Sequence, residues 1–338
     1  MRNRAGPQEM IAEQAATIRH QLAYCVRDDL ALIRVFGADA LTFLHRVMTA
    51  DVRRLAVGQS APSALLTQKG GVVFVADICR GEDDLLLVVA RAQRLLVEQS
   101  LARYAVMDDV EFVQLERELI GVYGAALPDR WSAAADQWAR QRELAPGWTA
   151  EVVADDSLGT LGSLIAVDPA QAARLVEQLV ADGAAEVGLD AVEVCRVEAG
   201  SPGAAEFADG AFLLELGQLG RVSFEKGCYI GQEPVCRAYN RGGVQRRLVA
   251  LAFAGEAPEA GASLSAPGKQ DAGRVTSVAA SPTYGLIGLG VVHRSVLGEL
   301  LRFGEQTEAR VVELPRQADG APRLALPRCA PRYREQAC

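Results

Sequence analysis

Two stretches of the chain repeat the same local pattern. Leu86–Leu101 and Leu164–Leu179 each begin with an apolar run and continue with an amphipathic segment that contains Val-Glu-Gln. An apolar run followed by a 3.6-residue period predicts a strand that leads into a helix. Further apolar runs at 110–115 and 192–197 predict another strand after each helix. The repeated strand–helix–strand pattern therefore predicts an α+β fold with two related subdomains.

The C-terminal third has a different character. Leu248–Phe253 is strand-like, and Gly, Pro and Ser recur through the residues that follow it. Short strands with frequent turns predict a small β-barrel or sandwich, and we expect a barrel. The length of 338 residues favours more than one domain. We expect the following parts: a charged N-terminal extension that frays (1–28), two α+β subdomains (29–243, split into 29–60 with 150–243 and 61–149), a β-barrel (244–314) and a Pro/Arg-rich tail (315–338).

Composition excludes several classes of protein. The formal net charge of −8 argues against direct nucleic-acid binding through bulk charge. Neither a membrane span nor a secretory signal is present, so we expect a cytoplasmic protein. Seven scattered cysteines without a CxxC motif do not make a disulfide framework, and no two of the three histidines are close in sequence. We therefore expect no metal site.

The segment Phe224–Glu233 combines a thiol, an aromatic ring and an amide with two glycines. Gly227 and Gly231 allow unusual backbone angles around Cys228. A helix start near Pro234, with Lys226 beside the thiol, would lower the pKa of Cys228 and make it reactive. A buried structural cysteine in a glycine-rich turn explains these residues equally well.

Lys-Gly-Cys-Tyr-Ile-Gly-Gln-Glu at 226–233, followed by Arg237, resembles the signature of the YgfZ-type folate-binding proteins. These are relatives of the glycine-cleavage T-protein, an aminomethyltransferase. Further segments resemble other blocks of the family: Arg196–Gly200, Phe212–Gly217, Val35–Leu44, Thr49–Val52 and Leu66–Gly71. Together the resemblance covers about residues 29–253.

The resemblance implies three domains in a ring, with tetrahydrofolate or a derivative in the central opening. It places Glu198 on the pterin, because a carboxylate can accept two parallel hydrogen bonds from the ring N–H and the amino group. Without the resemblance, Glu198 is a surface strand residue paired with Arg196. The other candidate folate contacts are Arg196, Tyr229, Gln232 and Arg237.

The arginine-rich run 237–247 could bind the glutamate tail of a folate or an RNA phosphate, although a solvated hairpin is the commoner outcome for such a run.

One departure from the family bears on activity. Aminomethyltransferases carry Asp-Asp shortly after the Gly-Gly pair, whereas here Gly70-Gly71 leads to Phe74. Phenylalanine cannot relay a proton, so we expect no aminomethyl transfer. Strand alternation places Asp77 on the opposite face from Phe74, which would make it a poor substitute.

The function that the resemblance implies is support of iron–sulfur enzymes or their assembly, with Cys228 as the working thiol, assisted by Lys226. The expected partners are a folate and those enzymes. The alternatives are a folate-dependent aminomethyltransferase and a folate-binding module associated with tRNA modification.

Overall fold

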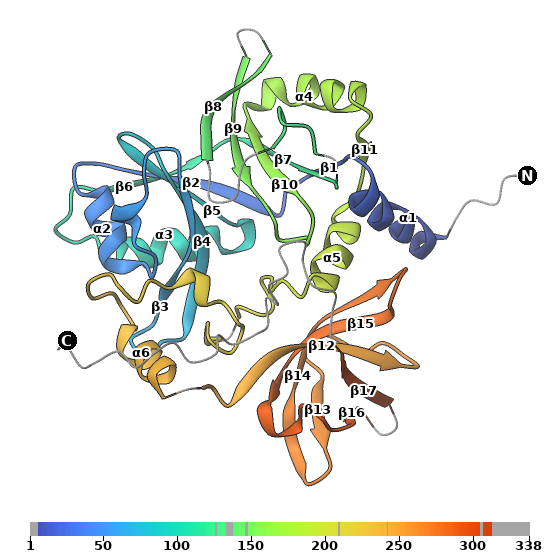
Figure 1. The fold of residues 1–338 in the computed structure, drawn as a ribbon. Helices are drawn as coiled ribbons and strands as arrows, with labels where there is room; N and C mark the ends of the chain where they lie inside the picture. The colour runs from blue at the N-terminus through green and yellow to red at the C-terminus, as the bar shows by residue number, and fades with distance from the viewer. Residues whose placement is uncertain are drawn as a thin grey trace, which may run out of the picture.

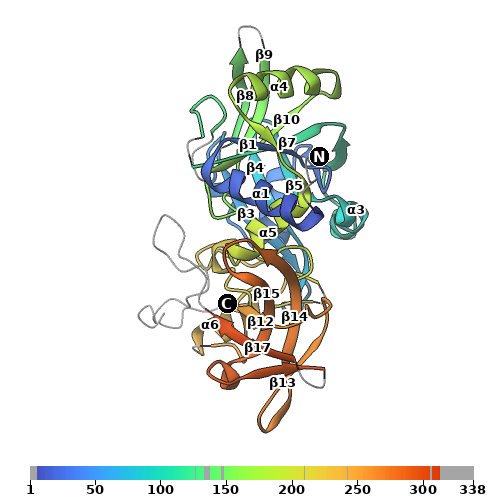
Figure 2. The ribbon, with the colours of Figure 1, turned by 90° about the vertical axis from the view of Figure 1, so that its right-hand side faces the viewer.

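The computed structural model describes residues 6–125, 127–132, 138–145, 148–208, 210–241, 243–304 and 307–312. Two open sheets and one closed barrel organise them. In Figure 1 the two open sheets occupy the upper half and the barrel lies below them. Figure 2, turned by 90°, shows the same separation, with the barrel at one end of an elongated molecule. Among the described residues, no helix is long and apolar enough to cross a membrane.

The first sheet comes from one continuous part of the chain. Its helices α2 (Ala40–Val47) and α3 (Arg94–Ala102) share a core with the sheet, and Phe43, Phe74 and Val97 are fully buried there. In spatial order the strands are β3 (Ser60–Leu66), β4 (Val72–Arg80), β5 (Asp84–Ala90), β2 (Leu30–Phe36) and β6 (Glu111–Leu115).

The second sheet has helix α4 (Pro169–Ala181) packed on it, with Leu175 and Leu179 in a core that also holds Trp131 and Trp148. The two sheets also contact each other, because Cys79 and its neighbours form one buried cluster with Leu164 and other residues of the second sheet. In spatial order the strands are β11 (Ala185–Glu186), β1 (Ala23–Val26), β7 (Glu118–Tyr123), β10 (Gly162–Val167), β9 (Trp148–Ala154) and β8 (Trp138–Ala145).

Two helices connect the second sheet to the barrel. Helix α1 (Pro7–His20) packs on α5 (Leu189–Glu198), and residues of both share a core with barrel residues such as Leu289. The chain then passes through the short helix η3 (Leu219–Arg221) and helix α6 (Gln232–Asn240) before it enters the barrel.

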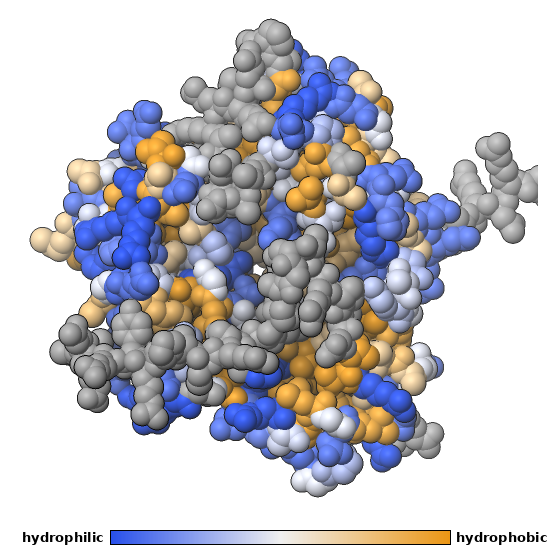
Figure 3. All heavy atoms as spheres, viewed as in Figure 1, coloured by the Kyte–Doolittle hydropathy of each residue, from blue (hydrophilic) through white to orange (hydrophobic). Residues whose placement is uncertain are grey.

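The barrel is closed by six strands. In spatial order they are β12 (Arg246–Ala254), β15 (Gly285–His293), β14 (Lys269–Ser281), β13 (Ser263–Ala266), β16 (Leu301–Phe303) and β17 (Thr307–Val312). Figure 3 shows a hollow at the centre of the molecule, between the two open sheets and the barrel.

The predicted fold class is confirmed: two subdomains built on sheets and helices stand beside a C-terminal barrel. Three expectations are corrected. The described part of the expected extension 1–28 is not frayed, because α1 buries Ile18 and β1 joins the second sheet. The run 192–197 is helical, since its buried residues follow a helical spacing in α5. The first sheet takes residues 30–115 and the second takes β1 together with 118–186, which differs from the expected split into 29–60 with 150–243 and 61–149. The predicted tail 315–338 lies outside the described residues.

Candidate functional site

Segments that are far apart in the sequence meet at the glycine-rich motif. The backbone N–H of Ser223 donates to the carbonyl of Thr49 at 3.0 Å, and the Thr49 hydroxyl donates to the carbonyl of Arg221 at 2.5 Å. Thr49 is fully buried, and its hydroxyl also accepts from the backbone N–H of Ala64 at 2.9 Å. The segment that leads into the motif is therefore fastened to the end of α2 and to β3.

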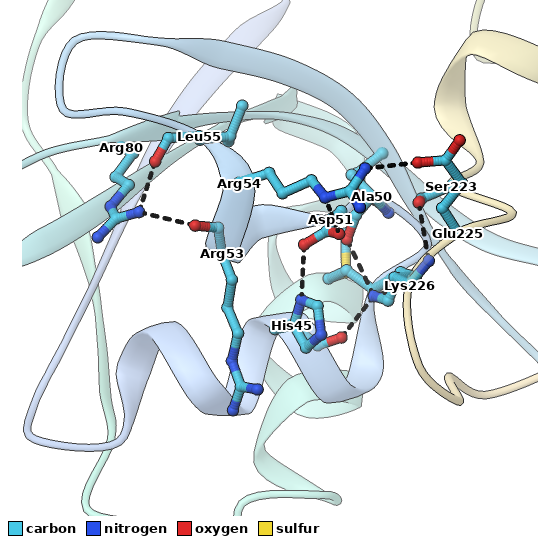
Figure 4. A network of polar contacts seen from close by, with 12 residues as sticks. His45, Ala50, Asp51, Arg53, Arg54, Leu55, Arg80, Ser223, Glu225 and Lys226 are labelled. Carbon is cyan, nitrogen blue, oxygen red and sulfur yellow. Dashed lines mark hydrogen bonds and ion pairs between the residues drawn. The ribbon is translucent and has the colours of Figure 1, made fainter.

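Lys226 caps the C-terminal end of α2. Its ammonium donates to the carbonyls of His45, Met48 and Ala50 at 2.5, 2.6 and 2.9 Å (Figure 4). The last carbonyls of a helix have no partner within the helix, and a lysine can supply the missing donors. Burial lowers the pKa of Lys226 to about 8. All three N–H groups of the ammonium are used by carbonyls of α2 and of the residues just after it, so none remains to donate to the sulfur of Cys228.

A network of ionisable groups surrounds this lysine (Figure 4). The Nδ1 atom of His45 lies 3.2 Å from a carboxylate oxygen of Asp51, and Arg54 connects Asp51 to Glu225 of the motif. Burial lowers the pKa of His45, and the charge of Lys226 lowers it further. The sequence does not show these roles of Asp51 and its neighbours, and the resemblance of Thr49–Val52 to a block of the family was the one signal that pointed to the segment.

The two glycines of the motif differ. Gly231 adopts a φ of 79°, and a Cβ atom there would lie 2.4 Å from the carbonyl oxygen of Thr67. Close approach to the turn 66–71 thus requires glycine at this position. Gly227 has no atom within 4 Å of such a Cβ and no positive φ, so the expectation of unusual angles holds at Gly231 alone.

Cys228 is exposed, whereas Tyr229 after it and Lys226 two positions before it are buried. The ring of Tyr229 lies 5.2 Å from the ammonium of Lys226, and burial raises the pKa of Tyr229. The buried Tyr229 hydroxyl has no hydrogen-bond partner within the described part of the chain. Helix α6 begins at Gln232, four positions after the thiol. The loop therefore presents Cys228 to solvent from an anchored backbone.

Glu198 lies at the end of α5, and its side chain is buried. The hydroxyl of Ser281 donates to Oε1 at 2.5 Å, and the guanidinium of Arg19 pairs with Oε2. The alternative of a surface strand residue paired with Arg196 is therefore wrong, because Glu198 is buried on a helix and pairs with Arg19. A carboxylate has about four acceptor positions, so these two partners leave capacity for a ligand with two N–H donors.

The other candidate folate-binding residues make contacts away from the Glu198 carboxylate. Arg196 clamps α5 to the barrel by bonding to Glu193, Glu206 and Ser277 at 2.5–3.1 Å. Arg237 is exposed and pairs with Glu233 on its own helix. Among the described residues, no contact connects Tyr229, Gln232 or Arg237 to Glu198, so the structure does not gather these candidates around one carboxylate.

Strand β4 separates Phe74 from Asp77, as strand alternation predicts. Phe74 is fully buried in the core beneath α2 and α3. Asp77 lies on the other face of the strand and accepts a hydrogen bond from Arg221 at 3.3 Å. The face of Phe74 is filled by the core, so its identity says nothing of the opposite face. Position 75, on the face of Asp77, is valine and cannot ionise either.

Comparisons with known proteins agree with this architecture. The model of the GCVT N-terminal domain family matches residues 3–217. The tRNA-modifying protein YgfZ of Escherichia coli (strain K12) is 32% identical over 269 residues, which cover 75% of this chain and 78% of that protein. The Shigella flexneri protein of the same name gives the same values. The glycine cleavage system aminomethyltransferase T of Bartonella henselae has the same fold, with a TM-score of 0.80, 22% identity and coverage of 92% of this chain and 91% of that chain.

Proposed function

The chain belongs to the GCVT N-terminal domain family as a YgfZ-type member, and from that premise we propose that it binds a reduced folate such as tetrahydrofolate. We propose further that it supports the assembly or repair of iron–sulfur enzymes through Cys228. The observation that carries the folate proposal is the buried carboxylate of Glu198, whose acceptor positions exceed its present partners.

The pterin end of a folate fits this carboxylate chemically. Its ring N–H and amino group point in one direction, as the N–H groups of a guanidinium do, and a carboxylate accepts both. Ser281 and Arg19 hold the Glu198 carboxylate in one orientation. That orientation reduces the entropy lost when a ligand is bound. Arg196 would act indirectly, because its clamp fixes the helix that carries Glu198.

Isothermal titration with tetrahydrofolate tests the proposal. Glu198→Ala removes a charged acceptor that faces two donors, and we expect a loss of about 1.5–3 kcal/mol, about tenfold or more in affinity. Glu177→Ala on the exposed side of α4 is the matched control and should bind like the parent. An unchanged affinity in folded Glu198→Ala would remove this residue from the site, and a parent that binds no folate would refute the proposal.

The role of Cys228 rests on its exposure within an anchored loop. A thiol must reach its target to bind a metal or form a bond, and a rigid backbone limits where it can point. In cells that lack the native protein, we expect Cys228→Ser to support iron–sulfur enzyme activity less well than the parent. Equal complementation by a Cys228→Ser protein of unchanged thermal stability would make the cysteine structural.

The E. coli and Shigella relatives are named as tRNA-modifying proteins, and this connects to the proposal. A protein that maintains iron–sulfur enzymes would affect tRNA modification wherever those enzymes carry it out, without binding RNA itself. We therefore expect tRNA modification that depends on this chain to require Cys228, while the purified chain shows no stable complex with tRNA.

A further inference from the structure

The arginine-rich run 237–247 lies where α6 leads into the barrel. The exposed face of α6 carries Arg237 and, at its end, Arg241, whereas Val235 is buried on the other side of the helix. The chain then turns into β12, which begins at Arg246 (Figure 1). Residues four apart lie on the same face of a helix, so two guanidinium groups share one solvent-facing stripe that ends beside the barrel.

A third arginine reaches this junction from strand β15. Arg294 directly follows that strand, and its backbone N–H donates to the carbonyl of Gln245 at 2.8 Å. Its guanidinium lies beside the turn between α6 and β12, because a Cβ atom on Gly243 would be 3.3 Å from its Nη1 atom. Arg247, the second residue of β12, lies opposite Val292 of β15. We refer to Arg237, Arg241, Arg247 and Arg294 as the junction patch.

Three members of the junction patch have no partner of opposite charge. Arg241 and Arg294 are exposed and Arg247 is half-buried, and within the described part of the chain none of their side chains forms a hydrogen bond or an ion pair. Arg237 pairs with Glu233 on its own helix, but both side chains are mostly exposed, and such a surface pair is weak. In a chain of net charge −8, this local excess of positive charge favours a negatively charged partner.

The acidic residues beside the patch indicate which kind of partner fits. Glu233 and Asp271, which pair with Arg237 and Arg246, are 79% and 77% exposed. A nucleic-acid backbone would meet both carboxylates as like charges. Proteins that hold nucleic acid by charge commonly contact about 6–10 phosphates, more than three unpaired arginines can reach. A protein surface can offer carboxylates to the arginines and basic side chains to the two acids.

The C-terminal end of this chain is not complementary to the junction patch. Residues 313–338 contain five arginines and three acidic residues, so they would add positive charge to a surface that is already positive. Like charges brought together oppose binding. The occupant is therefore a different protein.

We propose that the junction patch is the docking surface for a protein partner whose surface is acidic at its centre and basic at its edges. This inference rests on the proposed function and identifies that partner as the iron–sulfur protein on which Cys228 acts. Stacking of Phe224 on Tyr239, with ring centroids 4.2 Å apart, fixes the motif to α6. Helix α6 is about 14 Å long, and a typical interface covers about 800 Å² on each protein, so a partner on the patch also reaches the exposed thiol.

The first test uses cells that lack the native protein. Arg241→Glu combined with Arg294→Glu should lower iron–sulfur enzyme activity to the level that Cys228→Ser gives. Lysine at both positions should preserve most of the activity, because it preserves the charge. The matched control is Arg302→Glu with Arg310→Glu, on β16 and β17, where both arginines are exposed and have no partner among the described residues. This control should support the enzymes as the parent does.

Purified variants show whether an effect comes from the surface alone. Thermal unfolding, tetrahydrofolate affinity and the rate of Cys228 alkylation should be the same in the parent, in Arg241→Glu with Arg294→Glu and in the control. A fluorescein-labelled peptide of ten glutamates is the binding probe. At low salt we expect the junction-patch variant to bind it at least about tenfold more weakly than the parent and the control do. Binding by the parent should weaken as salt is added.

The nature of the partner is tested in cells with a photoreactive amino acid at Asn240, on the exposed face of α6. Cross-links should form to protein, resist ribonuclease and disappear when Arg241→Glu and Arg294→Glu are added. Cross-links to RNA would overturn the proposal, and so would a glutamate peptide that binds the variant as tightly as the parent.

The outcomes separate this inference from the proposed function. If Cys228→Ser loses enzyme support while Arg241→Glu with Arg294→Glu keeps it, the docking inference falls and the proposed function stands. If Cys228→Ser keeps full support, the proposed role of the thiol falls. The identification of the partner as its iron–sulfur protein then falls with it, whatever the glutamate peptide does.

Discussion

The guanidinium of Arg19 on α1 pairs with the carboxylate of Glu198 at the end of α5, although 179 residues separate them in the chain. The pair joins the N-terminal helix to the carboxylate that we assign to the pterin. Helix α1 is therefore a structural part of the candidate site. Its packing on α5 through Ile18 and Ala15 holds the guanidinium in place.

Arg19→Gln should lower the free energy of unfolding by about 1–3 kcal/mol. The change leaves the buried carboxylate of Glu198 without its counter-charge, and the partial exposure of Arg19 keeps the cost below that of a fully buried pair. Arg46→Gln removes an exposed pair with Asp108 and should cost less than about 1 kcal/mol. Urea unfolding measures the loss of free energy in each variant. Equal losses would show that the Arg19–Glu198 pair stabilises the fold no more than an exposed ion pair does.

The two motif glycines should respond differently to alanine. Gly231→Ala forces a side chain into a left-handed backbone and against the carbonyl of Thr67, so we expect a loss of more than about 2 kcal/mol. Gly227→Ala meets open space and should change stability by less than about 0.5 kcal/mol. Thermal unfolding of the two variants checks this, and similar losses would contradict the described loop.

Lys226 should make stability depend on pH in the alkaline range. Its pKa is about 8 in the folded chain and about 10.5 in the unfolded chain, so the folded state binds fewer protons between these values. Rising pH then favours folding. Below pH 8 the folded state carries the whole free-energy cost of burying a charged ammonium, and by about pH 10.5 this cost has disappeared.

The measurement is the unfolding free energy of the parent minus that of Lys226→Met, from urea titrations between pH 7.5 and 10. Other groups titrate alike in both proteins and cancel. We expect the difference to move in favour of the parent by up to about 3 kcal/mol as the pH rises. A difference that stays constant would show that the lysine keeps an ordinary pKa in its cage of carbonyls.

Thiol labelling should follow exposure. Iodoacetamide applied to the native protein near neutral pH should modify Cys228 before Cys79 and Cys195, which are buried. Burial also raises the pKa of Cys195 to about 12, which leaves little thiolate at neutral pH. Mass spectrometry of peptides resolves each site, and labelling of Cys195 before Cys228 would contradict the described burial.

The chain should not catalyse aminomethyl transfer. Neither position 74 nor position 75 can hold a proton, because they are phenylalanine and valine. Incubation with tetrahydrofolate and an aminomethylated lipoyl carrier should release ammonia at the uncatalysed rate. Turnover well above that rate would restore the transferase alternative, and loss of that turnover in Asp77→Asn would then identify Asp77 as its acid.

The sequence by itself determined the local elements and the identity of the motifs. The hairpin of β4 and β5, helix α2 and the short strands of the C-terminal part follow from periodicity and turn residues within a few positions of each other. The closure of those short strands into a barrel pairs β12 with the distant β17 and is a tertiary feature. The glycine-rich motif can be recognised from the sequence because its residues are adjacent in the chain. The helical α5 was mistaken for a strand because its valines also suit a strand, and only packing on α1 and the barrel decides between them.

Only the tertiary structure decided which charges meet. The ammonium of Lys226 bonds to carbonyls about 180 residues earlier in the chain, and not to the neighbouring thiol. The core of the first sheet fills the face of β4 that carries Phe74, whereas Asp77 on the opposite face pairs with Arg221, which lies 144 residues later in the chain. A buried charge takes whichever partner the packing of distant segments brings within hydrogen-bond distance, and no local pattern in the sequence records that choice.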